Sequence, residues 1–152
     1  MESLQILAPI AGVLALLFAL YLANKISRED AGTSKMKEIA EAIHSGAMAF
    51  LGRQYRTLVI FIVALAIIIV ILGFATPGAE SLQPATAITF VIGAICSILA
   101  GNFGMRVATK ANVRTANAAA KSGLNKALSI AFSGGAVMGM SVVGLGLLGL
   151  GI

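Results

Sequence analysis

The sequence contains four long apolar stretches separated by polar or turn-forming segments. They cover residues 4–24, 58–74, 85–105 and 127–152. A helix rises about 1.5 Å per residue, so roughly 20 residues cross the hydrocarbon core of a bilayer. Backbone groups in lipid must find their hydrogen-bond partners within the same helix, so each stretch is a predicted transmembrane helix. The expected fold class is all-α, a polytopic transmembrane helical bundle with four transmembrane helices.

Composition supports a lipid bilayer as the surroundings of this chain. Of the 152 residues, 59% are hydrophobic and 11% are charged, whereas roughly 25% of the residues in a soluble domain are charged. The single cysteine, Cys96, lies inside an apolar stretch. The chain can therefore form neither an internal disulfide nor a CxxC metal motif.

The basic residues predict the orientation of the helices. Of the eleven Lys and Arg residues, six lie in Lys25–Arg56 and five in Arg106–Lys126. Basic residues collect in the cytoplasmic connections of membrane proteins. We therefore expect the connections 25–57 and 106–126 to be cytoplasmic and both termini to be non-cytoplasmic. Because these residues follow the ends of the spans, the net charge of +5 does not indicate a nucleic-acid partner.

Two of the predicted helices extend beyond their apolar stretches. The segment Ser34–Leu51 has apolar residues at helical spacing, with Thr33 or Ser34 as its N-cap after Gly32, and we expect it to run into the second span. The third helix is predicted to continue to Lys121, with Gly123 ending it. The stripe on the first of these segments consists of Ile39, Ala42, Ile43, Gly46, Ala47, Phe50 and Leu51.

Small residues predict where helices approach one another closely. Close helix packing is favoured by three features: an alanine face on the first helix, a ladder of small residues on the third helix, and the many glycines of the fourth helix. The second span is rich in bulky β-branched residues, which suits a lipid-facing position. The alanine face contains Ala11, Ala15, Ala19 and Ala23, and the ladder contains Gly93, Ser97, Gly101, Gly104 and Ala108.

Few residues could carry chemistry. No Asp, Glu, Lys or Arg lies in the middle of a span, although ion pathways normally contain such a group. We read the acids of the first connection as a solvated helix face of mixed charge. His44 is a poor metal site by itself and is expected on the polar side of its helix, while Asn102 suggests an interhelical hydrogen bond. The six acids are Glu2, Glu29, Asp30, Glu38, Glu41 and Glu80.

The second basic connection forms a patch that no acid interrupts in the sequence. Two interpretations stay open for it. The patch could attract an anionic substrate to the cytoplasmic face, or it could set the topology and contact anionic lipid. The stretch GNFGMR lacks the GxxxxGK[ST] pattern of a phosphate loop. The patch consists of Arg106, Lys110, Arg114, Lys121 and Lys126.

Two segments carry a resemblance to a known family. GNFGMRVATKANVRTANAAAKSGLNKALSIAFSGGAVMGM, residues 101–140, resembles the third-to-fourth helix segment of membrane-bound, ion-pumping pyrophosphatases. AIHSGAMAFLGRQYRTL, residues 42–58, is similar to the sequence that leads into the second helix of that family. The resemblance covers the whole chain, which would make residues 1–152 the N-terminal transmembrane portion of a larger helical domain.

The resemblance implies an activity that this portion would not carry alone. Members of the family couple pyrophosphate hydrolysis to H⁺ or Na⁺ transport, use Mg²⁺ and work as homodimers. Their catalytic aspartates lie on helices that would follow Ile152, so the resemblance assigns no catalytic, substrate-binding or metal-binding residue here. Residues 1–152 would be scaffold, partnered by the remaining helices. The alternative is a self-contained small four-helix membrane protein, either a transporter subunit or a structural protein.

Overall fold

The computed structural model describes residues 2–75 and 84–150, which form four α-helices. These are α1 (Glu2–Arg28), α2 (Ser34–Ala75), α3 (Pro84–Lys121) and α4 (Leu124–Leu150). All four are long and apolar enough to cross a membrane. The predicted all-α fold with four transmembrane helices is therefore confirmed, and each helix begins before the apolar stretch that predicted it.

The long extensions of α2 and α3 are confirmed. α2 is one unbroken helix from Ser34, and its N-cap is Thr33, whose hydroxyl accepts a hydrogen bond from the Met36 amide at 3.3 Å. α3 continues to Lys121, and Gly123 ends the helical run with a φ of 86°. A positive φ strains residues with a Cβ, so glycine suits this turn.

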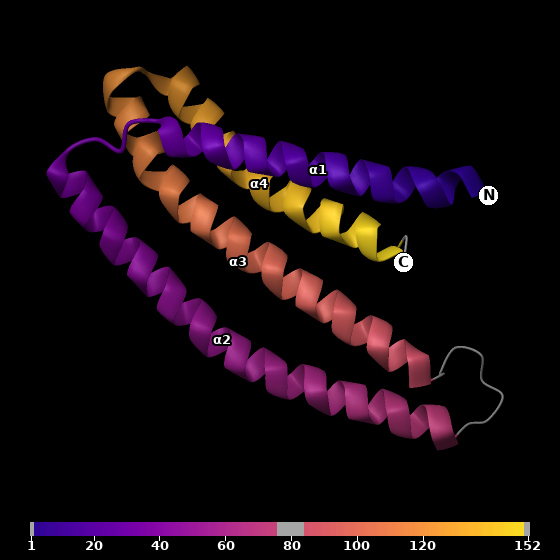
Figure 1. The fold of residues 1–152 in the computed structure, drawn as a ribbon. Coiled ribbons are helices and arrows are strands. Elements are labelled where there is room, and N and C mark those ends of the chain that lie inside the picture. Colours follow the sequence, from indigo (N-terminus) through magenta and orange to yellow (C-terminus); the bar gives the residue numbers. More distant parts are fainter. Residues whose placement is uncertain (1, 76–83, 151–152) are drawn as a thin grey trace.

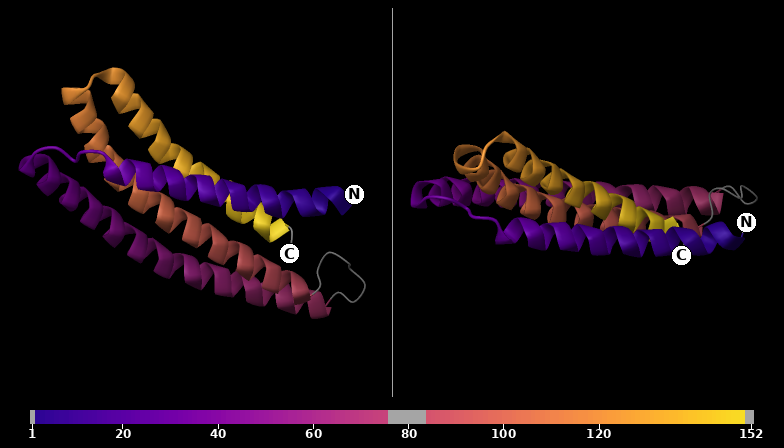
Figure 2. Two further views of the ribbon diagram at one scale, coloured as in Figure 1. Left: turned by 45° about the horizontal axis from the view of Figure 1, so that its top comes forward. Right: turned by 90° about the horizontal axis from the view of Figure 1, so that it is seen from above.

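The helices follow one another across the bundle in the order α2, α3, α4 and α1 (Figure 1). α4 packs against both α1 and α3, whereas α2 packs chiefly against α3. Viewed from other directions, α1 and α4 approach each other toward the ends marked N and C, while α2 runs alongside α3 (Figure 2). The α1–α2 and α3–α4 connections lie at the same end of the bundle, and α1 begins and α4 ends at the other (Figure 1).

Small side chains line the core between α1, α3 and α4. Ala19 and Val137 are almost completely buried. The backbones of α1 and α4 approach so closely that a Cβ added at Gly144 would lie 2.9 Å from the Gly12 carbonyl oxygen. The predicted alanine face is confirmed at Ala15 and Ala19, while Ala11 is exposed.

The ladder predicted on α3 is only partly confirmed. Gly104 packs tightly on Met138 of α4. Near Gly93, however, no described atom lies close enough to contact a Cβ, and Ser97 is exposed. The expectation of close packing there is wrong within the described chain, because α4 diverges from α3 toward that end (Figure 1).

Candidate functional site at the basic end of the bundle

Arg114 of α3 holds the C-terminal end of α1. Its Nε donates a hydrogen bond to the Glu29 carbonyl at 3.0 Å, and one terminal nitrogen donates to the Ser27 carbonyl at 3.4 Å. The other donates to the Lys110 carbonyl at 2.8 Å. The last carbonyls of a helix lack partners within it and carry partial negative charge. A planar cation with several donors satisfies them, so Arg114 caps α1 from a neighbouring helix.

Asp30 organises the connection between α1 and α2. Its carboxylate accepts hydrogen bonds from the Gly32 amide at 2.9 Å and from the Lys121 ammonium at 3.0 Å. Asn117 donates to the Asp30 carbonyl at 3.0 Å. The Gly32 amide, followed by Lys121 and Asn117, lowers the pKa of Asp30 to about 2. The carboxylate is therefore charged at neutral pH and ties the connection to the C-terminal part of α3.

The second basic connection is not free of acids in space. Glu29 pairs with Lys126 at the start of α4, and Asp30 pairs with Lys121 at the end of α3. The interpretation of these two acids as part of a helix face is wrong, because both follow the end of α1. Asp30 is nevertheless exposed, as expected, while Glu29 is half-buried. Two carboxylates of the first connection are thus matched by two ammonium groups of the second.

Polar contacts between side chains of α2 and groups of α3 occur at two places recorded among the described residues. The Nδ1 of His44 lies 2.9 Å from the Thr109 hydroxyl, and the Tyr55 hydroxyl donates to the Ile98 carbonyl at 3.4 Å. His44 was expected on the polar side of its helix, but it faces α3. The helix rotation that brings it there leaves Ile43 and Phe50 of the apolar stripe exposed.

Asn102 also differs from its prediction. Its side-chain oxygen accepts a hydrogen bond from Nε of Arg106, one turn along the same helix, at 2.7 Å. The expected interhelical bond is wrong, because a long basic side chain four residues away can reach back to the amide.

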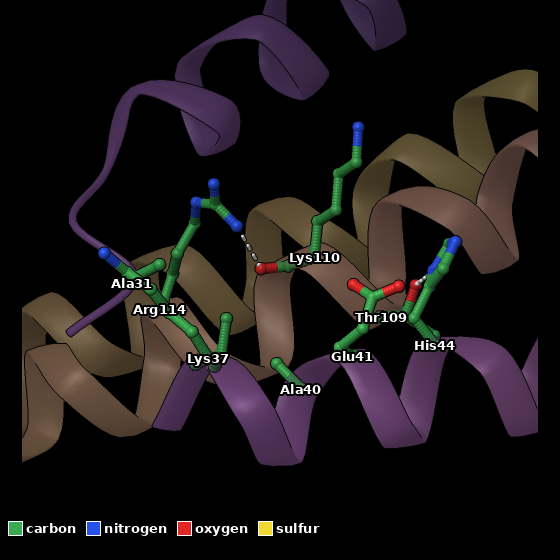
Figure 3. Close-up of a pocket in the computed structure, with 9 residues that line it drawn as sticks. Ala31, Lys37, Ala40, Glu41, His44, Thr109, Lys110 and Arg114 are labelled. Carbon is green, nitrogen blue, oxygen red and sulfur yellow. Dashed lines mark hydrogen bonds between the residues drawn. The ribbon is translucent and has the colours of Figure 1, made fainter. Parts of the chain in front are cut away.

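A hollow of about 330 Å³ opens between the α1–α2 connection, α2 and α3. Residues of all three elements line it (Figure 3). Its charged groups are Lys37 and Glu41 of α2 and Lys110 and Arg114 of α3, and His44 borders it beside Thr109. Three positive groups and one negative group give it a positive field.

The relationship of the chain to known proteins follows from its sequence. The family model described as inorganic H⁺ pyrophosphatase matches residues 13–152. This chain belongs to that family. It is 56% identical, over 92% of its length, to a protein of Clostridium tetani named as a putative K⁺-stimulated pyrophosphate-energized sodium pump. It is 48% identical, over 93% of its length, to a K⁺-insensitive pyrophosphate-energized proton pump of Methanosarcina mazei.

The alignments cover most of this pyrophosphatase-family chain but only a small part of each relative. It aligns with 19% of the Clostridium protein and 20% of the Methanosarcina protein. A third relative, a proton pump of Moorella thermoacetica, is 49% identical over 88% of this chain and 18% of its own length. The chain thus spans about a fifth of the length of the curated relatives that it matches.

The described residues of this pyrophosphatase-family chain do not fit a Mg²⁺ site. Mg²⁺ prefers an octahedral set of oxygen ligands that includes carboxylates. Within residues 2–75 and 84–150, no three His, Cys, Asp or Glu side chains gather closely enough to hold a metal ion. The carboxylates of Glu29 and Asp30 are paired with ammonium groups. We therefore assign no metal ligand and no catalytic step to these residues.

Sequence reasoning missed the role of two polar residues on α3. Arg114 was read only as part of a basic patch, and Asn117 was assigned no role. The two lie three residues apart, which places them on one helix face. The signals available in the sequence were this shared helix face and the Asp-Ala-Gly turn that follows the first helix.

Proposed function

We propose that this chain is the N-terminal scaffold of a membrane pump that couples pyrophosphate hydrolysis to the transport of H⁺ or Na⁺. The family match over residues 13–152 carries the proposal, together with relatives named as sodium and proton pumps. Ion transport, hydrolysis and the binding of the pyrophosphate that is hydrolysed would involve the parts of such a pump that these residues do not represent.

The proposal includes a cofactor, an assembly and an orientation. Mg²⁺ would be held by residues outside this chain and would supply charge stabilisation for the pyrophosphate. The whole pump would form a homodimer, as the resemblance implies. The end that carries both basic connections would face the cytoplasm, because all eleven Lys and Arg residues lie in them.

The test is Mg²⁺-dependent release of phosphate from pyrophosphate by membranes. We expect activity in membranes that contain the natural full-length product and none in membranes that contain residues 1–152 alone. Comparable turnover by residues 1–152 would overturn the scaffold role. No turnover by the full-length product, at verified expression, would overturn the enzymatic proposal.

Orientation is tested separately by chemical labelling. In a Cys96→Ser background, Lys35→Cys places a thiol on an exposed position of the first basic connection. A membrane-impermeant maleimide added to intact cells should label it only after permeabilisation. Labelling of intact cells would reverse the proposed orientation without affecting the enzymatic proposal.

A further inference from the structure

The hollow between the α1–α2 connection, α2 and α3 contains basic groups that are not used to hold the fold. Three other lysines at this end, Lys35, Lys121 and Lys126, are paired with carboxylates. For Lys37 and Lys110, which border the hollow, the structure records no ion pair within the described residues. The two lysines come from different helices, α2 and α3, and both line the same open space (Figure 3).

Arg114 contributes charge to the hollow but few free donors. Its Nε and both terminal nitrogens donate to backbone carbonyls. These bonds fix the guanidinium at the back of the space, where its positive charge favours an anion. Glu41 is the one negative group on the border, so the charged groups leave a net positive field even when His44 is neutral.

The size and position of the hollow restrict its ligand. A volume of about 330 Å³ corresponds to roughly ten times the share of one water molecule in the liquid. It therefore accommodates a phosphate group together with a substituent. Lys110 follows the predicted span 85–105 by about one helical turn, a depth at which lipid headgroups meet a helix.

We propose that this hollow binds a phosphate group, with Lys37 and Lys110 as its direct ligands and Arg114 as a fixed positive charge behind them. Lysine binds phosphate as a point charge on a flexible stem, which suits a group held from two helices. The phosphate belongs either to the headgroup of an anionic phospholipid or to free phosphate or pyrophosphate. The inference concerns binding alone and goes beyond the proposed scaffold role.

Binding is measured on the full-length protein in two arms. In the first, the protein is placed in nanodiscs that contain phosphatidylglycerol and phosphatidylcholine, and bound phosphatidylglycerol is counted by native mass spectrometry. In the second, lipid-depleted protein in detergent is titrated with inorganic phosphate and with pyrophosphate by calorimetry. Binding in the first arm alone identifies a headgroup site. Binding in the second arm alone identifies a site for the free ion in this hollow only if Lys37→Gln and Lys110→Gln weaken it, because the pump would also bind pyrophosphate where it is hydrolysed.

Substitutions assign the binding to this hollow. Lys37→Gln and Lys110→Gln should each weaken it by about fivefold, the contribution of one basic side chain near an anionic surface. The matched control is Lys35→Gln, which removes a charge two residues from Lys37 but from a lysine paired with Glu38. It should leave binding within about twofold.

Glu41→Gln protects the test against simple misfolding. Removing this negative charge should strengthen phosphate binding, whereas a damaged fold would weaken it. The proposal is overturned if phosphate binds in neither arm. It is also overturned if Lys37→Gln, Lys110→Gln and Glu41→Gln all bind like the parent protein, or if Lys35→Gln weakens binding as much as Lys37→Gln does.

Discussion

The two sides of the bundle are held together in different ways. α1 and α4 meet through glycine and alanine, and their connections are held by the half-buried Arg114 and by two ion pairs. α2 meets one neighbour, through scattered side chains and two polar contacts, and side chains such as Ile60 and Phe61 are more than 60% exposed. Small residues allow backbones to approach, whereas bulky β-branched residues present an apolar surface outward. Close packing is therefore concentrated on the side of α1 and α4.

The most damaging single change should be at the closest approach of α1 and α4. A Cβ at Gly144 would lie 2.8 Å from Cγ of Leu16 and 2.9 Å from the Gly12 carbonyl oxygen. Because a backbone atom blocks the space, Gly144→Val should destabilise the protein by about 3 kcal/mol. Thermal unfolding of the full-length protein in detergent measures the change. Gly139→Val is the control, since nothing described lies within 4 Å of a Cβ there; equal losses at both sites would contradict the close contact.

Replacement of Arg114 should have the next largest effect. Arg114→Leu removes the donors for the Ser27 and Glu29 carbonyls and should cost about 2 kcal/mol, since hydrogen bonds from charged groups contribute about 1.5–3 kcal/mol. Thermal unfolding measures the loss, and limited proteolysis at the α1–α2 connection locates it. Arg106→Leu is the control, because Arg106 bonds only within α3. Arg114→Lys should not restore stability, as it lacks the planar fork.

A change on α2 tests the looser side of the bundle. His44→Ala removes the contact with the Thr109 hydroxyl and should cost about 1 kcal/mol. The cost stays small because that hydroxyl still donates within α3, where the Met105 and Arg106 carbonyls lie 3.0 and 3.1 Å away. Unfolding in detergent provides the measurement, with Ser45→Ala as an exposed control on the same helix. A loss as large as that of Gly144→Val would abolish the distinction between the two sides.

The smallest expected effect is a pH dependence in the stability of the folded α1–α2 connection. The folded state lowers the pKa of Asp30 from 3.8 to about 2. A carboxylate with a lowered pKa stabilises the folded state above its unfolded pKa, and this contribution is lost as the pH falls through the folded value. Protection of the connection from proteolysis by pepsin should therefore decline between about pH 4 and pH 2. Asp30→Asn should remove that decline. If the variant loses protection over the same pH range as the parent protein, Asp30 is not its cause.

The sequence was sufficient for the helices but not for their contacts at the basic end. The continuous α2, the Thr33 cap and the turn at Gly123 follow from local rules, because the residues that decide them are neighbours in the chain. The pairing of Asp30 with Lys121 joins residues that are 91 positions apart, and no local pattern encodes such a distance.

The same limit explains the errors within helices. Periodicity located an apolar stripe on α2 but could not tell which neighbour it would meet, so His44 was placed on the wrong side. For Asn102, a partner four residues away was chosen over one on another helix. Both errors concern the choice of partner, which depends on how helices rotate and approach once they pack.

The cap that Arg114 provides to α1 has a consequence for biosynthesis. Arg114 lies 85 residues after Glu29, whose carbonyl it binds. At the usual rate of about 5–20 residues per second, a ribosome needs roughly 4–17 seconds to make the intervening chain. For that time the end of α1 has no partner from α3, and Glu29 and Asp30 have none from Lys121 or Lys126. The hairpin of α1 and α2 is therefore made before its connection has these partners, and the contacts form only when α3 and α4 have been synthesised.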